Sequence, residues 1–222
     1  MTFDINVILD QMPAIVSGAG VTLMTWIVGT IAAAVLGFFV AVGRRFGGML
    51  LDNVLGFAVA VLRGTPFLIQ IFLVYYGGPF IGLSLDPIPA GLIGISIYGA
   101  AYYSEIFRSG FLAVPKGHIE AGECVGMTQG QIIRRILLPE MTMLVLPPSL
   151  NMAVLLMKET AVLSIITVPE LTATLSAIGA QQYAFVEALS VLALFYWVLV
   201  EITGRLGHLV ETKLTRFRFF NA

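Results

Sequence analysis

Lys158 and Glu159 are adjacent charged residues, followed by the hydroxyl of Thr160, in a stretch that is otherwise apolar. An ammonium and a carboxylate side by side can complement the two opposite charges of a zwitterionic solute. On a helix, however, successive residues point about 100° apart, so the two side chains cannot face one partner. We predict that Glu159 faces a solute cavity and that Lys158 pairs with an outer-end acid or a backbone carbonyl. The alternative is that both residues only form structural pairs.

Three further polar residues lie in or beside apolar stretches, and two of them, Ser104 and Glu105, are weaker candidates for a solute path. Ser104 and Glu105 are neighbours, but Glu105 can also form an ion pair with Arg108, three residues later. Arg63 begins the run RGTP (63–66), and its long side chain can reach headgroups or backbone carbonyls, which is a structural role. The glycine and proline of this run predict a kink that bends the helix around a central cavity.

The composition identifies a membrane protein. Of the 222 residues, 58% are apolar and only 11% are charged, and the mean hydropathy is +0.95. Such a chain has too little polar surface to cover a water-soluble globule. In lipid, a segment of about 20 residues can satisfy all its backbone hydrogen bonds within itself only as a helix. We therefore predict an all-α membrane protein. The net charge of −1 gives no indication of nucleic acid binding, and the single Cys124 excludes an internal disulfide.

The apolar stretches predict a single domain, residues 1–222, with five membrane spans. An odd number of spans places the chain ends on opposite faces. With the N-terminus outside, every lysine and arginine except Lys158 lies at or near the cytoplasmic face, as the positive-inside bias requires. Because Pro66 removes a helix hydrogen bond, the alternative for the second span is an interfacial helix over 52–62 and a span over 64–85. The predicted spans cover residues 18–42, 54–77, 88–108, 143–166 and 185–207.

Both ends of the chain carry segments with the composition of an interfacial peptide. Residues 3–12 are compatible with a short amphipathic helix along the outer interface, and equally with a frayed start. Residues 208–220 mix bases with aromatic rings, which predicts a cytoplasmic segment anchored in lipid.

A polar loop, residues 115–140, separates the third and fourth predicted spans. Its pattern predicts a helix over 116–125 that ends at Gly126 in the left-handed conformation. Thr128 is the expected N-cap of a second helix, with Gln131 completing a capping box. Pro139 is expected to stop or kink that helix before the fourth span. Four aliphatic residues share one face of the second helix and three polar residues the other: Ile132, Ile133, Ile136 and Leu137 against Gln131, Arg134 and Arg135.

The spacing in this polar loop resembles the EAA motif of permease subunits of ATP-binding-cassette (ABC) importers. The motif is carried by Glu120, Ala121, Gly122, Gly126, Ile136, Leu138 and Pro139. The stretches RGTPFLIQIF (63–72), AYYSEIFRSGFLAVPKGHIEAG (101–122) and LMKETAVLSIITVPEL (156–171) resemble the polar amino acid importers within that family. Two residues depart from the pattern, because Gly122 stands where the motif usually has alanine and His118 where glutamine is common.

The resemblance implies a multi-subunit importer of the bacterial inner membrane. The polar loop would dock, as a cytoplasmic coupling helix, on one of two cytoplasmic ATPase subunits. A second permease subunit, identical or related, would complete the path, and an extracytoplasmic binding protein would deliver a polar amino acid. The chain has no phosphate-binding loop, so ATP and Mg²⁺ are expected on the ATPase subunits, and no catalytic residue, cofactor or metal is expected here.

Two other classes of protein remain as rivals. A secondary transporter or channel would use Lys158 and Glu159 as an ion relay, but it predicts inverted repeats, which the sequence lacks, and leaves the polar loop unexplained. A membrane scaffold without transport would accommodate the polar loop but not the charges inside the membrane. A cytoplasmic ATPase that co-purifies with the chain would favour the importer over both.

Overall fold

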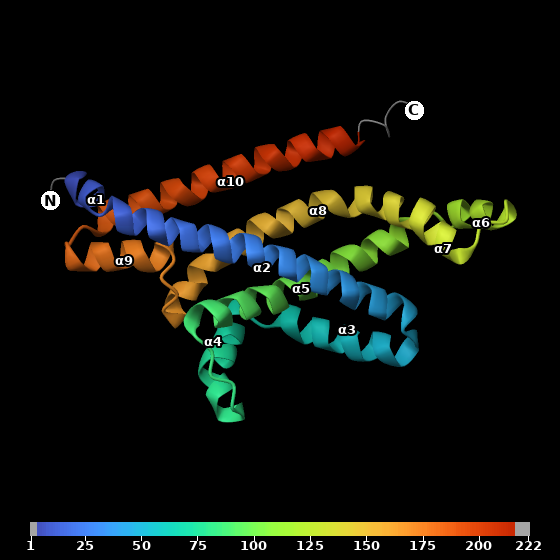
Figure 1. The fold of residues 1–222 in the computed structure, drawn as a ribbon, viewed down its shortest axis with the longest axis horizontal. Helices are drawn as coiled ribbons and strands as arrows, with labels where there is room; N and C mark the ends of the chain where they lie inside the picture. The colour runs from blue at the N-terminus through green and yellow to red at the C-terminus, as the bar shows by residue number, and fades with distance from the viewer. Residues whose placement is uncertain (1–3, 216–222) are drawn as a thin grey trace.

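The computed structural model describes residues 4–215 and folds them into helices, as the sequence predicts (Figure 1). Phe3 of the predicted N-terminal helix and residues 216–220 of the predicted tail lie outside the described residues. In chain order the elements are α1 Asn6–Asp10, α2 Met12–Phe46, α3 Gly48–Gly64, α4 Phe67–Gly77, η1 Gly78–Ile81, α5 Pro87–Ala113, α6 Lys116–Cys124, α7 Gln129–Ile132, η2 Ile133–Leu137, α8 Leu138–Glu159, η3 Thr160–Ile166, α9 Leu171–Gln181 and α10 Phe185–Thr215.

The packing of α2 along α5 forms the centre of the fold. A stripe of small buried residues runs along α2, of which Gly29, Ala33 and Gly37 are spaced four residues apart. A Cβ atom at Gly37 would lie only 2.6 Å from the Tyr103 Cβ and 2.9 Å from the backbone oxygen of Ala100. Small residues at this spacing let membrane helices approach closely. The two helices therefore run parallel with their backbones nearly in contact.

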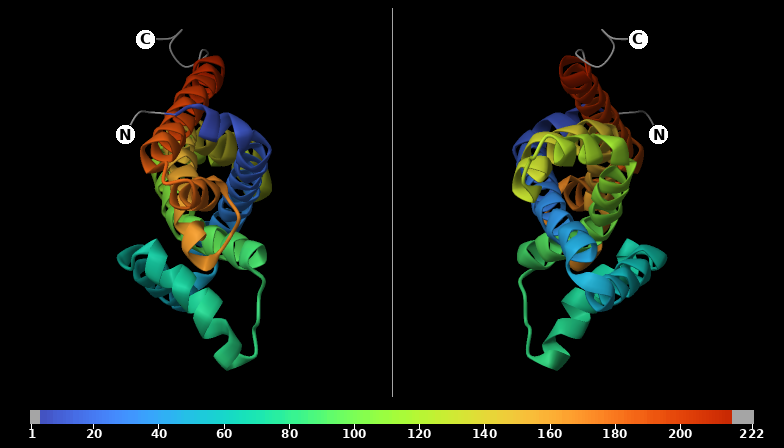
Figure 2. Two further views of the ribbon diagram at one scale, coloured as in Figure 1. Left: turned by 90° about the vertical axis from the view of Figure 1, so that its left-hand side faces the viewer. Right: turned by 90° about the vertical axis from the view of Figure 1, so that its right-hand side faces the viewer.

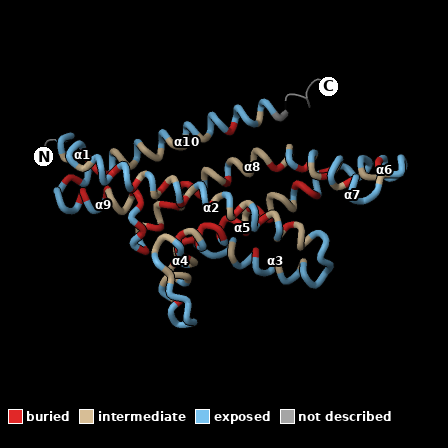
Figure 3. Tube along the Cα trace, viewed as in Figure 1, coloured by how far each residue is buried: buried red, intermediate tan, exposed pale blue. Residues whose placement is uncertain are grey.

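Helix α8 packs on another side of α5, so that α5 is enclosed over much of its length (Figure 3). Leu156 of α8 contacts Gly99, and the hydroxyl of Tyr103 donates a hydrogen bond to the backbone oxygen of Ser149 at 3.0 Å. On the α2 side, the indole N–H of Trp26 donates to the backbone oxygen of Ala153 at 2.8 Å. These contacts hold α2, α5 and α8 as one bundle.

The fully buried Glu170 caps α9 and joins it to α2. Its carboxylate accepts hydrogen bonds from the backbone N–H groups of Thr172 at 2.8 Å and Ala173 at 2.7 Å. Thr22 of α2 accepts a further bond from the N–H of Leu171 at 3.0 Å. Burial raises the pKa of Glu170, although the hydrogen bonds that it accepts act to lower it.

The predicted second span, 54–77, is broken into α3 and α4. The break lies at Thr65 and Pro66, both in extended conformation, and the two helices are bent by 104°. Proline explains this, because it has no N–H for the helix ladder and forces the preceding residue out of helical conformation. The kink predicted at Gly64 and Pro66 is confirmed. Helix α4 with η1 forms an arm that projects from the bundle (Figures 1 and 2).

Three of the described helical runs are long and apolar enough to cross a membrane by themselves: α2, the continuous run Gln129–Ile166, and α10. The bent pair of α3 with the arm gives a fourth crossing if it is counted as one span. The predicted third span coincides with α5, which falls outside this set although it is buried in the bundle. The membrane arrangement of five spans therefore stays a prediction. Helix α1 lies at one end of the long axis, and α10 runs from that end toward the other, where α6 and α7 lie (Figure 1).

Candidate functional site

The polar loop folds into a short helical hairpin at one end of the bundle (Figure 1). Its first helix, α6, ends as predicted, because Gly126 has a φ of 76°. The N–H of Gly126 donates to the oxygen of Glu123 at 2.9 Å, and that of Met127 donates to the oxygen of Gly122 at 3.0 Å. This pair of bonds closes the helix end and reverses the chain.

The second helix of the hairpin begins with the predicted capping box. The backbone N–H of Gln131 donates to the Thr128 hydroxyl at 3.4 Å, and the N–H of Thr128 donates to the Gln131 side chain at 2.9 Å. Ile132 and Leu137 are buried, whereas Arg134 and Arg135 are exposed, so the predicted division into an apolar and a polar face is confirmed.

Gly122 is the contact point between the two arms of the hairpin. It is buried, and a Cβ atom there would lie 2.9 Å from the Cδ1 of Ile136 and 3.3 Å from the Cγ1 of Ile132. The motif residues Glu120 and Ala121 are exposed on the outer side of α6. The hairpin thus has a packed inner seam and a free outer face.

His118 and Glu140 connect the hairpin to the start of α8. The Nδ1 of His118 lies 2.8 Å from each carboxylate oxygen of Glu140. His118 is one of the two residues that depart from the family pattern. This contact adds a polar link between α6 and α8 to the apolar packing of the hairpin.

The helix does not stop at Pro139, which was one of the two outcomes predicted there, a stop or a kink. The helical run continues through it, with a π-helical turn over Ile133–Leu137 directly before α8. Proline lacks an N–H and clashes with the carbonyl four residues earlier in an α-helix, and a wider π turn relieves both problems. The hairpin is therefore connected to α8 by continuous helix, with motif residue Leu138 as the first residue of α8.

A second group of polar residues lies between α3, α5 and the end of α8, where Tyr98 is buried and Arg63 is exposed. Glu159 is half-buried, accepts no hydrogen bond from the described residues, and interacts electrostatically with Tyr98 of α5. The hydroxyls of Tyr98 and Tyr102 are 3.5 Å apart. The guanidinium of Arg63, at the end of α3, lies 5.3 Å from the centroid of the Tyr102 ring. We call Glu159, Tyr98, Tyr102 and Arg63 the tyrosine site.

The other predicted path residues lie outside this group. Lys158 is exposed and makes no ion pair within residues 4–215, and the Thr160 hydroxyl donates to the oxygen of Met157 at 2.7 Å. Ser104 is buried and donates to the oxygen of Ala101 at 2.8 Å. The predicted pair of Glu105 and Arg108 is confirmed at 2.7 Å.

Sequence reasoning missed the two tyrosines and the position of Arg63. Tyr98 and Tyr102 are four residues apart and therefore share one face of α5, a signal that the sequence did contain. Nothing in the local sequence indicated that Arg63, 39 positions before Tyr102, would lie over that ring.

The chain is similar to known proteins in sequence and in fold. Residues 33–216 match the family described as binding-protein-dependent transport system inner membrane component. The chain belongs to this family. We therefore refer to it as the permease.

Its relatives are permeases of amino acid ABC transporters. The permease is 32% identical to the probable amino-acid ABC transporter permease protein YckA of Bacillus subtilis, covering 97% of this chain and 95% of that protein. It is 31% identical to the glutamine transport system permease protein GlnP of Escherichia coli, covering 96% and 99%. A crystal structure of an amino acid ABC transporter with histidines has a chain that matches with a TM-score of 0.89 and 29% identity, covering 96% and 100%.

Proposed function

We propose that the permease is the membrane subunit of an ABC importer that carries polar amino acids inward across the bacterial cytoplasmic membrane. The observation that carries this proposal is the capped hairpin of the polar loop on a chain of this family. ATP and Mg²⁺ would bind to two separate cytoplasmic ATPase subunits. An extracytoplasmic binding protein would deliver the solute.

The polar loop is the proposed coupling element. Glu120 and Ala121 are free to enter a cleft of an ATPase subunit, because they are exposed on the outer face of α6. The hairpin is stiffened at three places: the seam at Gly122, the cap at Gly126 and the His118–Glu140 contact. It therefore moves as a rigid unit when an ATPase subunit displaces it. Continuous helix through Pro139 then transmits the displacement to α8. Helix α8 ends at Glu159, so motion of the ATPase subunits reaches the tyrosine site along one helix.

A second permease subunit, identical or related, is the proposed partner inside the membrane. Five predicted spans are few for a path with two gates, and a symmetric pair is the commonest form of protein oligomer. The arm of α4 and η1 supplies an apolar surface for such a partner, because Phe80 is 92% exposed and Ile81 is 82% exposed at its tip. Opposite rotation of the two bundles would open the path to one side and then to the other.

Glu159 is the proposed contact for the substrate ammonium. A half-buried carboxylate with no hydrogen bond from the described residues retains its capacity to accept from a cation. The tyrosine hydroxyls offer neutral hydrogen-bonding groups, and Arg63 offers a cation at the far side of the pair. Polar amino acids carry groups that match these. Glu159 is the principal predicted residue of the solute path. The other predicted path residues are Lys158, Thr160, Ser104 and Glu105.

The proposal is tested by the ATPase activity of the purified complex in lipid, measured with and without loaded binding protein. The double variant Glu120→Ala, Gly126→Val should abolish the stimulation while the subunits still assemble. Valine at Gly126 would need a φ of 76°, which a β-branched residue rarely adopts. The matched control is Gly204→Val in α10, where nothing lies within 4 Å of the new Cβ, and it should leave the stimulation intact.

Two results would contradict the proposal. One is a permease that purifies without any ATPase subunit. The other is stimulation that is as strong in the double variant as in the control. In either case an ion relay through Lys158 and Glu159 becomes the hypothesis to test.

A further inference from the structure

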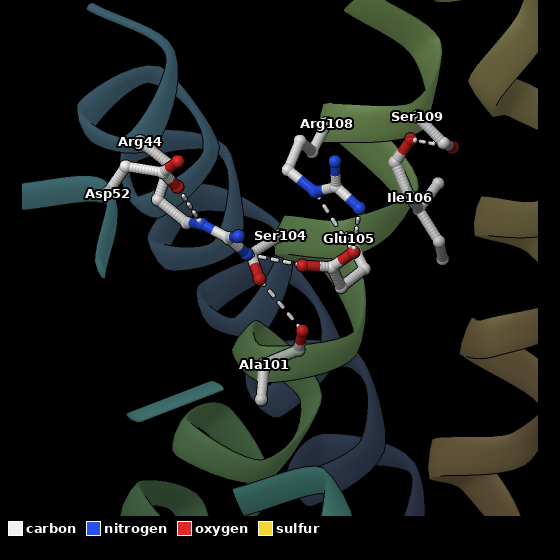
Figure 4. A network of polar contacts seen from close by, with 8 residues as sticks. All are labelled: Arg44, Asp52, Ala101, Ser104, Glu105, Ile106, Arg108 and Ser109. Atoms are coloured by element: carbon white, nitrogen blue, oxygen red, sulfur yellow. Dashed lines mark hydrogen bonds and ion pairs between the residues drawn. The ribbon is translucent and has the colours of Figure 1, made fainter. Parts of the chain in front are cut away.

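Three arginines gather where the ends of α2 and α5 meet. Two acids hold two of them, Arg44 and Arg108, in place (Figure 4). Arg44 donates from Nε to Asp52 of α3 at 2.8 Å and from Nη1 to Glu105. Glu105 also accepts from Nε and Nη2 of Arg108, at 3.0 and 2.7 Å. Glu105 therefore joins the two guanidiniums, and the pairing fixes their orientation.

Arg45 is the third member and has no carboxylate partner within residues 4–215. Its guanidinium carbon lies 5.5 Å from the ring centroid of Phe46 and 5.4 Å from that of Phe111. The two rings hold the cation by cation–π contact without neutralising it. The arginine cluster, Arg44, Arg45 and Arg108, thus exceeds its two acids by one positive charge.

The cluster lines an open cavity of about 230 Å³ together with Asp52, Phe111 and Leu112. Apolar side chains flank it: Leu112 is 64% exposed and Phe46 is 55% exposed. Just beyond them, at the start of α3, Met49 is 81% exposed and Leu50 is 79% exposed. A fixed positive charge beside an exposed apolar surface fits a molecule with an anionic head and a hydrocarbon tail.

The position of the cavity along the chain agrees with the headgroup level of a membrane. Arg44 is the first charged residue after the uncharged run that begins at Gln11. Arg108 lies near the end of α5, shortly before the polar loop begins. In the orientation of the proposed function, on which this inference rests, both arginines lie at the inner leaflet, where anionic lipids are concentrated.

We propose that the arginine cluster is a binding site for the phosphate of an anionic phospholipid. Arg45 and the free edge of Arg108 donate to the phosphate oxygens, while Asp52 and Glu105 keep the guanidiniums in position. The acyl chains lie along Leu112 and Phe46. The bound lipid bridges α2, α3 and α5 at the end of the bundle from which the polar loop projects.

The experiment measures lipid selectivity of the purified complex in phosphatidylcholine nanodiscs. Spin-labelled phosphatidylglycerol and spin-labelled phosphatidylcholine are compared for their association with the protein. The intact complex should prefer phosphatidylglycerol, and Arg45→Gln should reduce that preference about fivefold, as expected for one basic residue near an anionic lipid surface. Arg45→Lys, which keeps the charge, should retain most of it.

Arg205→Gln is the matched control, because Arg205 is an exposed arginine of α10 that is paired with Glu201. Loss of preference in Arg45→Gln but not in Arg205→Gln supports the site. An equal loss in both variants, or no preference in the intact complex, overturns it. Displacement of the labelled lipid by excess inorganic phosphate would assign the cavity to a soluble anion instead and would also overturn the lipid proposal.

The readout separates this inference from the proposed function. Lipid selectivity does not depend on ATP hydrolysis or on a binding protein. Stimulated ATPase activity without a preference for phosphatidylglycerol would contradict only the lipid site. A preference for phosphatidylglycerol without stimulated ATPase activity would contradict only the importer proposal.

Discussion

The polar loop and the tyrosine site are assembled in opposite ways. In the polar loop, the cap at Gly126 and the box at Thr128 and Gln131 join residues no more than five positions apart. In the tyrosine site, Arg63, Tyr102 and Glu159 come from α3, α5 and α8. Local motifs set the first, and tertiary packing sets the second.

This difference separates two kinds of sensitivity. A change in the polar loop should alter local opening and coupling and leave the affinity for substrate unchanged. A change in the tyrosine site should alter the response to substrate and leave the hairpin intact. Variants placed in each region therefore test whether coupling and substrate response are independent.

The largest effect is expected for Glu159→Gln. Glutamine keeps the shape of the side chain but loses the charge, and a hydrogen bond to a charged group contributes about 1.5–3 kcal/mol. The apparent KM for substrate-stimulated ATPase should rise roughly tenfold to one-hundredfold, because 1.4 kcal/mol corresponds to a factor of about ten. Basal ATPase activity and hydrogen exchange in the polar loop should be unchanged.

Glu201→Gln is the control for this variant, since Glu201 is an exposed acid paired with Arg205 on α10. It should leave the KM unaltered. Equal KM values for Glu159→Gln and the unaltered permease would show that the tyrosine site does not contact the substrate. This conclusion does not depend on the behaviour of the polar loop.

The second effect is expected for Gly126→Ala. A Cβ atom in the left-handed conformation costs about 1–2 kcal/mol, so the end of α6 should open more often. Hydrogen–deuterium exchange of the amides of Gly126 and Met127 should quicken roughly fivefold to thirtyfold, since these amides close the helix end.

Gly130→Ala is the matched control, because Gly130 lies in helical conformation in α7 and nothing lies within 4 Å of its Cβ position. Alanine there should slow the exchange, as it favours the helix. If both variants changed the exchange in the same direction, the cap would not be what holds the hairpin.

The same contrast explains what the sequence could predict. Helix α6, Gly126 and the capping box were predicted because each rule needs only a few neighbouring residues. Of the stop or kink expected at Pro139, the stop did not occur, since the rule for isolated helices omits the π turn that accommodates the proline. The arm and the position of Arg63 depend on how α3, α4 and α5 meet, which periodicity along one helix does not encode.

A smaller effect is expected for His118→Gln, which replaces the imidazole with a neutral amide that cannot form an ion pair. The contact with Glu140 is partly exposed, with 54% and 36% of the side chains accessible, so about 1 kcal/mol or less should be lost. Binding of the ATPase subunits should weaken by no more than about fivefold, as 1.4 kcal/mol corresponds to about tenfold.

A double-variant cycle with Glu140→Gln isolates this contact. If His118→Gln and the double variant weaken the subunits equally, the effect passes through the contact with Glu140. Additive effects would show that the two side chains act separately and that the hairpin is held by its apolar seam.

The smallest effect is expected for Gly122→Ala, the other position at which this permease departs from the family motif. Alanine favours a helix over glycine by about 1 kcal/mol. The new Cβ, however, would approach the Ile136 Cδ1 to 2.9 Å, and this methyl must shift. Because that atom is the end of a flexible side chain, the net change in the free energy of hairpin opening should be within about 0.5 kcal/mol.

Gly117→Ala in the same helix is the control, because nothing lies within 4 Å of the new Cβ, and it should show the full gain in exchange protection. The difference between the two variants measures how tightly the seam is packed, and equal gains would mean that the seam is too loose for the hairpin to act as a rigid coupling element.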